Sequence, residues 1–454
     1  MHREFSASVD RRSFLGVAGA TAGALVVPAI RAGVPSGKDQ RPNIVLITAD
    51  DLGYGDLSGY GRSDYQTLVL DRLAAEGTRF TQAYSIAPIC TPTRVGFMTG
   101  RYPARHPIGL LEPLTLAPAH SELGLEPTHS TVSSLLKDAG YTNALFGKWH
   151  LGVRREFHPN RHGFDEFFGP LGGAVDYAAH RDPSGAHDLD RNGEPVHREG
   201  YLTDLFADEA VRFIHQRREP FFLSHQGTAP HSPWQRRGDP AVGKSVGPFN
   251  VGPADRFPDM VRTLDEAVGR ILAALADAGI ADRTLIIFTS DNGGVQHSSM
   301  AGLARGKGHL WEGGIRVPTF VRWPGVIPGA VTTIQVATTL DWSATILAVA
   351  GTSPAATHPF DGIDLLPVLT GREPPQERTI FWRTSQRTQQ GAVRAAGWKY
   401  LRDEDGEYLF DLVHDPGERQ DRKLDEPERF DQLKGRYSIW EREMLPPVPL
   451  APIG

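Results

Sequence analysis

Two apolar runs of this 454-residue chain each lead into oxygen-bearing side chains. Asp50-Asp51 comes just after Ile44–Thr48, and Asp291-Asn292 comes just after Leu285–Thr289. In open α/β sheets, ligands bind outside the carboxyl ends of strands. Three acids and an amide suit a hard divalent cation such as Ca²⁺ or Mg²⁺, whereas zinc spacing of Cys and His is missing. Either pair alone could simply start a turn or cap a helix; both pairs before Gly-rich loops favour a cation site.

Cys90 is the only cysteine, so the chain cannot form an intrachain disulfide framework. A lone cysteine can be buried and inert, a free nucleophile or a modified residue, and without a motif the buried interpretation is favoured. Arg94 lies four residues later, one turn away in the helix expected over Thr91–Thr99, whose first turn tolerates Pro92. That spacing places a cation beside Cys90, where an anion would be held.

Three further segments carry polar groups among Gly or Pro. Lys148 and His150 alternate within Gly147–Gly152, so both point to one side if this segment is extended. His231 stands between two prolines, and Lys307 stands between two glycines that allow a ligand to approach closely. Each residue alone is typical of an ordinary surface position. Together they offer cations for an anion and groups that donate or accept protons.

Strands that alternate with helices predict an α/β core around a largely parallel sheet, which would position these residues. The expected strands are Asn43–Thr48, Arg79–Tyr84, Tyr141–Phe146, Pro220–His225 and Thr284–Thr289. The expected helices are Leu68–Gly77, Thr91–Thr99, Ser130–Gly140, Leu202–Gln216, Asp255–Gly279 and Thr338–Gly351. The intervening segments 153–200, 227–253 and 290–314 are expected to be loops, and long loops are usually functional.

Beyond about residue 375 the pattern changes to short strands and one helix, which predicts a small antiparallel subdomain. The expected elements are strands Thr379–Arg383, Gly391–Arg394, Lys399–Arg402 and Tyr408–Asp411 and a helix near Glu426–Tyr437.

The N-terminus has the pattern of a signal peptide. Arg11-Arg12 precedes the apolar run Leu15–Ala29, which is shorter than the ~20 residues of a membrane span. Twin arginines indicate export by the Tat translocase, and hence a bacterial protein that is periplasmic or secreted without a stable membrane anchor. Lys and Arg number 48 against 54 Asp and Glu, for a net charge of −6, which argues against nucleic acid as a partner. A content of 40% hydrophobic residues excludes a disordered chain.

At these residues the chain resembles the formylglycine-dependent (type I) sulfatases of the alkaline-phosphatase-like superfamily, over roughly 41–437. The most specific match is the modification signal Cys90-x-Pro92-x-Arg94. The other matching segments, in the same order as in the family, are Arg41–Ile44, Asp50–Asp56, Thr99–Pro103, Gly147–Gly152, Ser290–Gly293, Leu409–Leu412 and Asp415–Glu418. The pattern is similar to that of exported bacterial arylsulfatases and N-acetylgalactosamine-sulfatase-like enzymes.

The resemblance implies a fold with a large, mostly parallel sheet between helices and a small C-terminal subdomain. It divides the chain into a signal peptide (1–32), a linker (33–41), a catalytic domain (42–374) and an antiparallel subdomain with a tail (375–454).

The resemblance also implies that a formylglycine-generating enzyme oxidises Cys90 to an aldehyde before the chain folds. One hydroxyl of the hydrated aldehyde would attack sulfur, and the other would lose its proton as sulfate is expelled. The residues implied to hold Ca²⁺, with Mg²⁺ as the second choice, are Asp50, Asp51, Asp291, Asn292 and modified Cys90. Asp291 would be the base for the attacking hydroxyl.

Five other residues receive roles from the resemblance. Arg94 would orient the hydrated aldehyde, and His150 would assist the elimination. Lys148, Lys307 and His231 would bind sulfate and support the leaving oxygen, and either His231 or Lys307 would protonate it.

The substrate is expected to be a sulfated glycan or aryl sulfate. Four loop residues are candidates for sugar contacts, with ordinary loop packing as the alternative: Tyr177, His180, Asp182 and Trp234. The chain departs from the family at Thr67–Val69 and Asp421–Lys423, and segment 153–200 matches only in part. Two alternatives remain: a phosphonate or phosphate ester hydrolase of the same superfamily, and an inactive homologue that binds sulfated glycans.

Overall fold

The structure is a computed structural model that describes residues 41–116, 120, 122–217, 220–242, 251–386 and 389–448. The expected signal peptide, all of the expected linker except Arg41 and the last residues of the tail lie outside this part of the chain. Within the described residues, no helix combines the length and the apolar character needed to cross a membrane.

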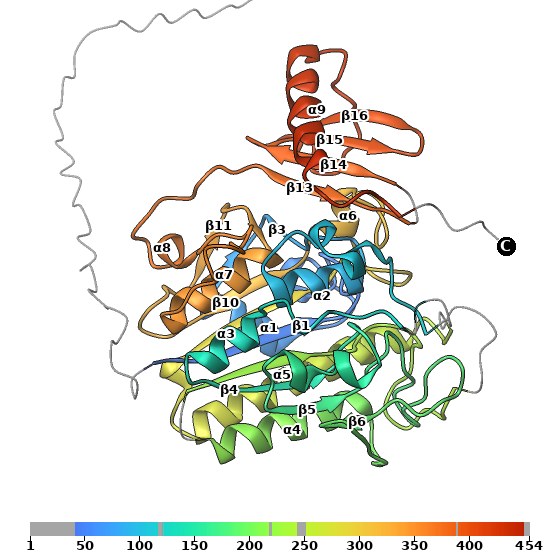
Figure 1. The fold of residues 1–454 in the computed structure, drawn as a ribbon, viewed down its shortest axis with the longest axis vertical. Helices are drawn as coiled ribbons and strands as arrows, with labels where there is room; N and C mark the ends of the chain where they lie inside the picture. The colour runs from blue at the N-terminus through green and yellow to red at the C-terminus, as the bar shows by residue number, and fades with distance from the viewer. Residues whose placement is uncertain are drawn as a thin grey trace, which may run out of the picture. The chain divides into compact units, whose positions relative to one another are not determined.

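A ten-stranded sheet runs through the larger part of the fold (Figure 1). In spatial order its strands are β11 (Val331–Thr333), β2 (Thr78–Phe80), β10 (Thr319–Arg322), β9 (Thr284–Ser290), β1 (Asn43–Ala49), β8 (Phe221–Gln226), β4 (Thr142–Gly147), β5 (Glu166–Gly169), β6 (Asp190–Arg191) and β7 (Glu194–Pro195). From β9 to β5 all neighbours are parallel, whereas β10 is antiparallel to both β9 and β2. The expected, largely parallel sheet is confirmed.

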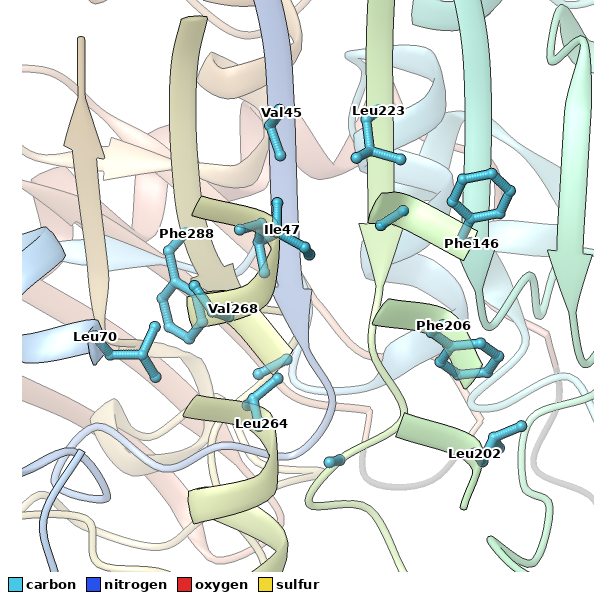
Figure 2. Packing of buried hydrophobic residues seen from close by; sticks show 14 of the residues in the cluster. Val45, Ile47, Leu70, Phe146, Leu202, Phe206, Leu223, Leu264, Val268 and Phe288 are labelled. Carbon is cyan, nitrogen blue, oxygen red and sulfur yellow. The ribbon is translucent and has the colours of Figure 1, made fainter. Parts of the chain in front are cut away.

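Strand β1 is covered on both faces, which explains its apolar run Ile44–Ile47. Val45 and Ile47 belong to one buried cluster, whereas Ile44 and Leu46 belong to another on the opposite face. In Figure 2, Ile47, Phe146 and Phe288 of the central strands lie on the side of the sheet that faces the helices of the first cluster. The helices over that face are α1 (Leu68–Ala75), α4 (Leu202–Gln216) and α5 (Arg256–Asp277). Those over the other face are α2 (Cys90–Thr99), α3 (Val132–Asp138), α7 (Thr339–Ala350) and α8 (Leu366–Leu369).

Capping residues help to explain why the ends of the six helices expected before residue 375 agree with the structure to within about two residues, whereas the last expected helix extends to Arg442 instead of Tyr437. Thr338 caps α7 through a reciprocal pair of hydrogen bonds with Asp341. Gly351 ends the same helix with φ of 71°, and Gly100 ends α2 with φ of 64°. These left-handed conformations favour glycine.

Several short strands were not predicted. Segment 153–200, expected to be irregular, contains β5, β6 and β7, which extend one edge of the sheet. The strand expected over Arg79–Tyr84 is two strands, β2 and β3 (Ala83–Tyr84), and β3 pairs with β12 (Ala337–Thr338) in a separate sheet. Strands of two to four residues are too short for an alternating pattern, so pairing partners decide where they form.

The C-terminal antiparallel sheet is confirmed. Its strands are β13 (Ile380–Arg383), β14 (Gly391–Ala395), β15 (Trp398–Asp403) and β16 (Gly406–Asp411), and α9 (Pro427–Arg442) packs against it. A buried cluster joins Trp382 and Phe410 of this sheet to Tyr84 and to Ile315 of the short helix α6 (Glu312–Ile315). The boundary between residues 374 and 375 stays a prediction.

The packing of α5 on the sheet predicts a large effect of truncating Leu264, which is fully buried. We expect Leu264→Ala to lower the free energy of unfolding by about 2–5 kcal/mol, because it loses apolar burial and leaves a cavity. Urea denaturation followed by circular dichroism measures the loss. Leu424→Ala is the matched control, since Leu424 is 87% exposed and should change little. If the two variants lost similar amounts of unfolding free energy, the packing of Leu264 against the sheet would be contradicted.

Candidate active site

The two polar pairs meet because β1 and β9 are neighbouring parallel strands. Thr48 aligns with Thr289 and Ala49 with Ser290, so Asp50-Asp51 and Asp291-Asn292 leave the sheet at the same edge. All four side chains are buried. The amide of Asp51 donates to Asp291 Oδ1 at 3.3 Å, and Asn292 Nδ2 donates to Asp51 Oδ1 at 2.8 Å. The expected convergence of the two strand ends is therefore present.

Cys90 is the first residue of α2 and is buried beside these acids. Its Sγ and one carboxylate oxygen each of Asp50 and Asp291 all lie within 4.8 Å of one another. Arg94 follows one turn later, as expected, and its Nη2 lies 3.0 Å from Asp291 Oδ2 and 3.7 Å from Asp50 Oδ2. The side chain of residue 90 and a guanidinium therefore face the same carboxylates.

Two lysines and a histidine complete the polar cluster. Lys148 Nζ lies 2.6 Å from Asp50 Oδ2, and Lys307 Nζ lies 2.6 Å from Asp51 Oδ1. His231 Nε2 lies 3.7 Å from Asp51 Oδ2. Lys148 directly follows β4, and its amide donates to the carbonyl of Gln226 at the end of β8. Segments far apart in the sequence thus bring cations to the acids of β1.

His150 is buried near the cluster in a left-handed conformation, with φ of 60°. Its Nε2 is 2.8 Å from the carbonyl oxygen of Leu114, and its Nδ1 has no partner among the described residues. Burial, reinforced by the charge of Lys148, lowers the pKa of His150 well below its usual value. The imidazole is therefore neutral, with one ring nitrogen free to exchange a proton.

The charges of the cluster shift the pKa values of its acids in opposite directions. Burial raises the pKa of Asp50, but the surrounding cationic groups, Lys148 first, outweigh burial and hold this pKa well below its usual range. Burial and the charge of Asp50 raise the pKa of Asp291 to about 7. Burial also raises the pKa of the Cys90 thiol. Asp291 thus has the affinity for a proton that a base near neutral pH needs.

The donor set fits a hard cation. Asp50 Oδ1 and Asn292 Oδ1 are buried and have no hydrogen-bond partner among the described residues. Buried polar oxygens normally have a hydrogen-bond partner, so these two oxygens after adjacent strands indicate an electropositive partner at this edge of the sheet. Carboxylate and amide oxygens are the ligands that Ca²⁺ and Mg²⁺ prefer.

One contributor to the site was not predicted from the sequence. Gln226 Oε1 accepts a hydrogen bond from Arg94 Nη1 at 3.2 Å, and the Lys148 carbonyl accepts another at 2.8 Å. The signal was available, because Gln226 is a polar residue at the carboxyl end of an apolar run. The sequence did not show that this strand lies between β1 and β4, and only this position brings Gln226 to the site.

The four candidate sugar contacts are buried and not displayed for a ligand. Tyr177, His180, Asp182 and Trp234 are each less than 7% exposed. The Tyr177 hydroxyl lies 2.6 Å from the carbonyl oxygen of Thr228 and 2.9 Å from that of His231. Packing of the loops is therefore their observed role, and for Tyr177 this packing supports the segment that carries His231.

Comparisons with known proteins identify the family of this fold and site. Residues 42–352 match the sulfatase family. The chain is 36% identical to N-acetylgalactosamine-6-sulfatase of Mus musculus over 370 residues, which cover 76% of this chain and 69% of that protein. It is also 36% identical to arylsulfatase A of Homo sapiens over 375 residues, which cover 76% of this chain and 71% of that protein. Among solved structures, Ps i-CgsB in complex with k-i-k-neocarrahexaose has a TM-score of 0.79 at 32% identity, covering 88% of this chain and 93% of that one.

The position of Arg94 predicts a marked loss of stability when its charge is removed. Arg94→Met leaves Asp50 and Asp291 buried without that charge, and breaking a buried ion pair costs about 3–5 kcal/mol. Urea denaturation in chelator-containing buffer measures the change. Arg154→Met is the matched control, since Arg154 is 43% exposed and pairs with acids that are also exposed. Exposed ion pairs contribute about 0–1 kcal/mol to stability. Equal losses of unfolding free energy in Arg94→Met and Arg154→Met would therefore contradict a stabilising role of the buried Arg94 ion pairs.

Proposed function

This chain belongs to the sulfatase family, and from that premise we propose that it removes sulfate from a sulfated carbohydrate with a formylglycine at position 90 and a bound Ca²⁺. Membership makes the chain an enzyme that hydrolyses sulfate esters. One observation carries the finer proposal. The terminal atoms of Cys90, Asp50 and Asp291 gather within 4.8 Å, and Lys148 pairs with the same Asp50.

Formylglycine would supply a nucleophilic oxygen as its hydrate, and Ca²⁺ would supply positive charge next to that oxygen and to the sulfate group. The residues that would hold the ion are Asp50, Asp51, Asp291 and Asn292, with the side chain of residue 90. The orphaned oxygens of Asp50 and Asn292 support this assignment. Mg²⁺ uses the same oxygen ligands and is the second candidate.

The cations of this chain would bind the sulfate group. Three acids, Asp50, Asp51 and Asp291, face three basic side chains: Arg94, Lys148 and Lys307. A divalent cation on the acids would leave the site positively charged. Lys148 and Lys307 would then release the carboxylates of Asp50 and Asp51 and bind oxygens of the sulfate group instead. Arg94 would orient residue 90. Charge-assisted hydrogen bonds of this kind favour the anionic transition state.

Proton transfers are assigned to four side chains. Asp291 is the proposed base for the attacking hydroxyl, because its oxygens lie close to residue 90. His231 and Lys307 both face Asp51, and we assign protonation of the leaving oxygen to this pair. His150 is proposed to assist the elimination of sulfate, because it is buried at the site and its Nδ1 has no hydrogen-bond partner among the described residues.

The proposed substrate class is a carbohydrate sulfate ester. Two relatives support it by what their names say: one acts on N-acetylgalactosamine 6-sulfate, and another was solved with a neocarrahexaose. We also propose maturation by a formylglycine-generating enzyme and export through the Tat translocase to the periplasm or beyond. The Cys90-x-Pro92-x-Arg94 motif and the Arg11-Arg12 pair support these two steps.

One prediction of the proposed function concerns residue 90 in protein made by a host that forms formylglycine. The tryptic peptide Phe80–Arg94 should lose the mass expected when a thiol-bearing CH₂ becomes an aldehyde, and it should react with aldehyde reagents. The protein should then hydrolyse aryl sulfates and sulfated sugars. Cys90→Ala should lower this activity by at least ~10³-fold, because the nucleophile is gone.

Aryl phosphate provides the control substrate. Faster turnover of aryl phosphate than of aryl sulfate would favour a phosphate ester hydrolase. An unmodified thiol, in a host that modifies a known sulfatase, would reject the mechanism and favour a glycan-binding homologue.

Another prediction concerns how the affinity for Ca²⁺ depends on pH. Burial raises the pKa of Asp291 to about 7 without an ion, so Ca²⁺ must displace a proton below that pH. The association constant, measured by calorimetry on chelator-treated protein, should fall about tenfold per pH unit below pH 7 and level off above it. Asp291→Asn should bind Ca²⁺ more weakly and lose this slope. A constant affinity between pH 5.5 and 7 would contradict the assignment.

A further inference from the structure

The loop that carries Lys307 rests against the segment that leads to Cys90. The amide of Gly308 donates to the carbonyl of Pro88 at 2.8 Å, and the amide of Lys307 donates to that of Gly294 at 2.9 Å. The ammonium of Lys307 reaches Asp51 from this position. The lysine side chain is long and flexible, so the place of its ammonium depends on how firmly this loop is held.

The short helix α6 follows this loop and also touches the turn that contains Asn292. The carbonyl of Gly314 accepts a hydrogen bond from the amide of Gly293 at 2.9 Å. The amide of Gly313 donates to Ala304 at 2.8 Å, which closes the loop on itself. A shift of α6 would therefore move both the Lys307 loop and the turn after Asn292.

A buried set of charges fastens α6 to the C-terminal sheet. Lys399 on β15 places its Nζ 3.1 Å from Glu312 Oε1 and 2.8 Å from Glu418 Oε1. Glu418 Oε2 accepts a hydrogen bond from the amide of Glu312 at 2.6 Å. Lys399 and Glu312 are fully buried and Glu418 is 5% exposed. The hydroxyl of Tyr84 donates to Glu312 Oε2 at 2.9 Å and fixes the same carboxylate from the main domain.

A second set of hydrogen bonds joins the same sheet to the residues just before α6. Gln390 Oε1 accepts from the amide of Leu310 at 2.6 Å. Asp403 accepts from Trp311 Nε1 and from Gln390 Nε2, each at 2.6 Å. The C-terminal sheet thus holds the Lys307 loop at both its last residues and the helix that follows.

We propose that Lys399 is a positioning residue for the sulfatase reaction, acting through Glu312 and Glu418 to hold the Lys307 loop at the active site. The inference rests on the proposed role of Lys307 in binding sulfate. Lys399 touches no substrate and moves no proton. Its loss leaves Glu418 buried without its cation and leaves Glu312 with Arg316, whose Nη1 lies 3.4 Å from Glu312 Oε2. This change displaces α6, because a buried acid left unpaired is strongly unfavourable.

A double-mutant cycle tests this inference in the full-length, formylglycine-bearing enzyme with an aryl sulfate. Lys399→Met should lower kcat/KM by about 10- to 100-fold, because a displacement of about 1 Å in a positioned group has that effect. It should also raise the inhibition constant of inorganic sulfate. In the Lys307→Ala background the same change should lower kcat/KM by less than about threefold, since the residue acts through Lys307.

Three further variants make the cycle decisive. Lys434→Met is the matched control, because Lys434 pairs with Glu407 in the same subdomain at 2.6 Å on the surface and touches neither α6 nor its loop. It should leave kcat/KM within about twofold. Lys399→Arg should recover part of the activity. Glu418→Gln removes one charge with little change of shape, and it replaces Lys399→Met in the cycle if the latter does not unfold cooperatively.

The outcomes separate this inference from the proposed function. Equal fold losses in the wild-type and Lys307→Ala backgrounds, with an unchanged inhibition constant for sulfate, would overturn the positioning role. No effect of Lys307→Ala by itself would instead reject the proposed role of Lys307.

Discussion

The parallel register between β1 and β9 is the constraint on which the rest of the site depends. It aligns Thr48 with Thr289, so that the acids after each strand emerge side by side. The register itself is set by the core, because Val45 and Ile47 face one buried cluster while Ile44 and Leu46 face the other. A slip of one residue would exchange the two faces and separate the acids. Apolar packing thus determines where the polar chemistry occurs.

The site concentrates buried charge, and the backbone around it adopts conformations that are unfavourable elsewhere. Asp51 and His150 have φ of 67° and 60°. Non-glycine residues in this region cost about 1–3 kcal/mol and persist only where the surroundings hold them. Here the surroundings are ion pairs and hydrogen bonds from several segments, including Lys307 on Asp51 and the Leu114 carbonyl at His150. The fold thus holds these charged groups in place, and preorganised charges of this kind favour an anionic transition state.

The C-terminal sheet belongs to the same physical argument. A buried cluster of Trp382, Phe410, Tyr84 and Ile315 joins it to the main part of the fold, and the charges around Lys399 lie beside this cluster. Apolar contacts supply most of the affinity between the two parts, because buried ion pairs contribute little net stability. The charged contacts instead specify one orientation of α6. The Lys307 loop needs this fixed orientation more than it needs added stability, because the position of its ammonium group depends on it.

The sequence by itself predicted the fold class and the main helices, and it singled out most of the residues that gather at the candidate site. Apolar periodicity and capping residues such as Thr338 and Gly351 are local properties, so the long elements could be predicted from them. The matched motifs of Cys90, Asp50 and Asp291 predicted a cluster, and the ends of β1 and β9 and the start of α2 do bring these residues together.

Only the tertiary structure decided features that depend on partners distant in sequence. The short strands β5 to β7 form because the edge of the sheet offers hydrogen bonds. Gln226 reaches Arg94 because β8 lies between β1 and β4, and Tyr177 is buried under the His231 segment instead of facing a ligand. Lys399 meets Glu312 across 87 residues of sequence. The order of apolar and polar residues within a segment does not predict such contacts, because they depend on loop closure and on the packing of the whole chain.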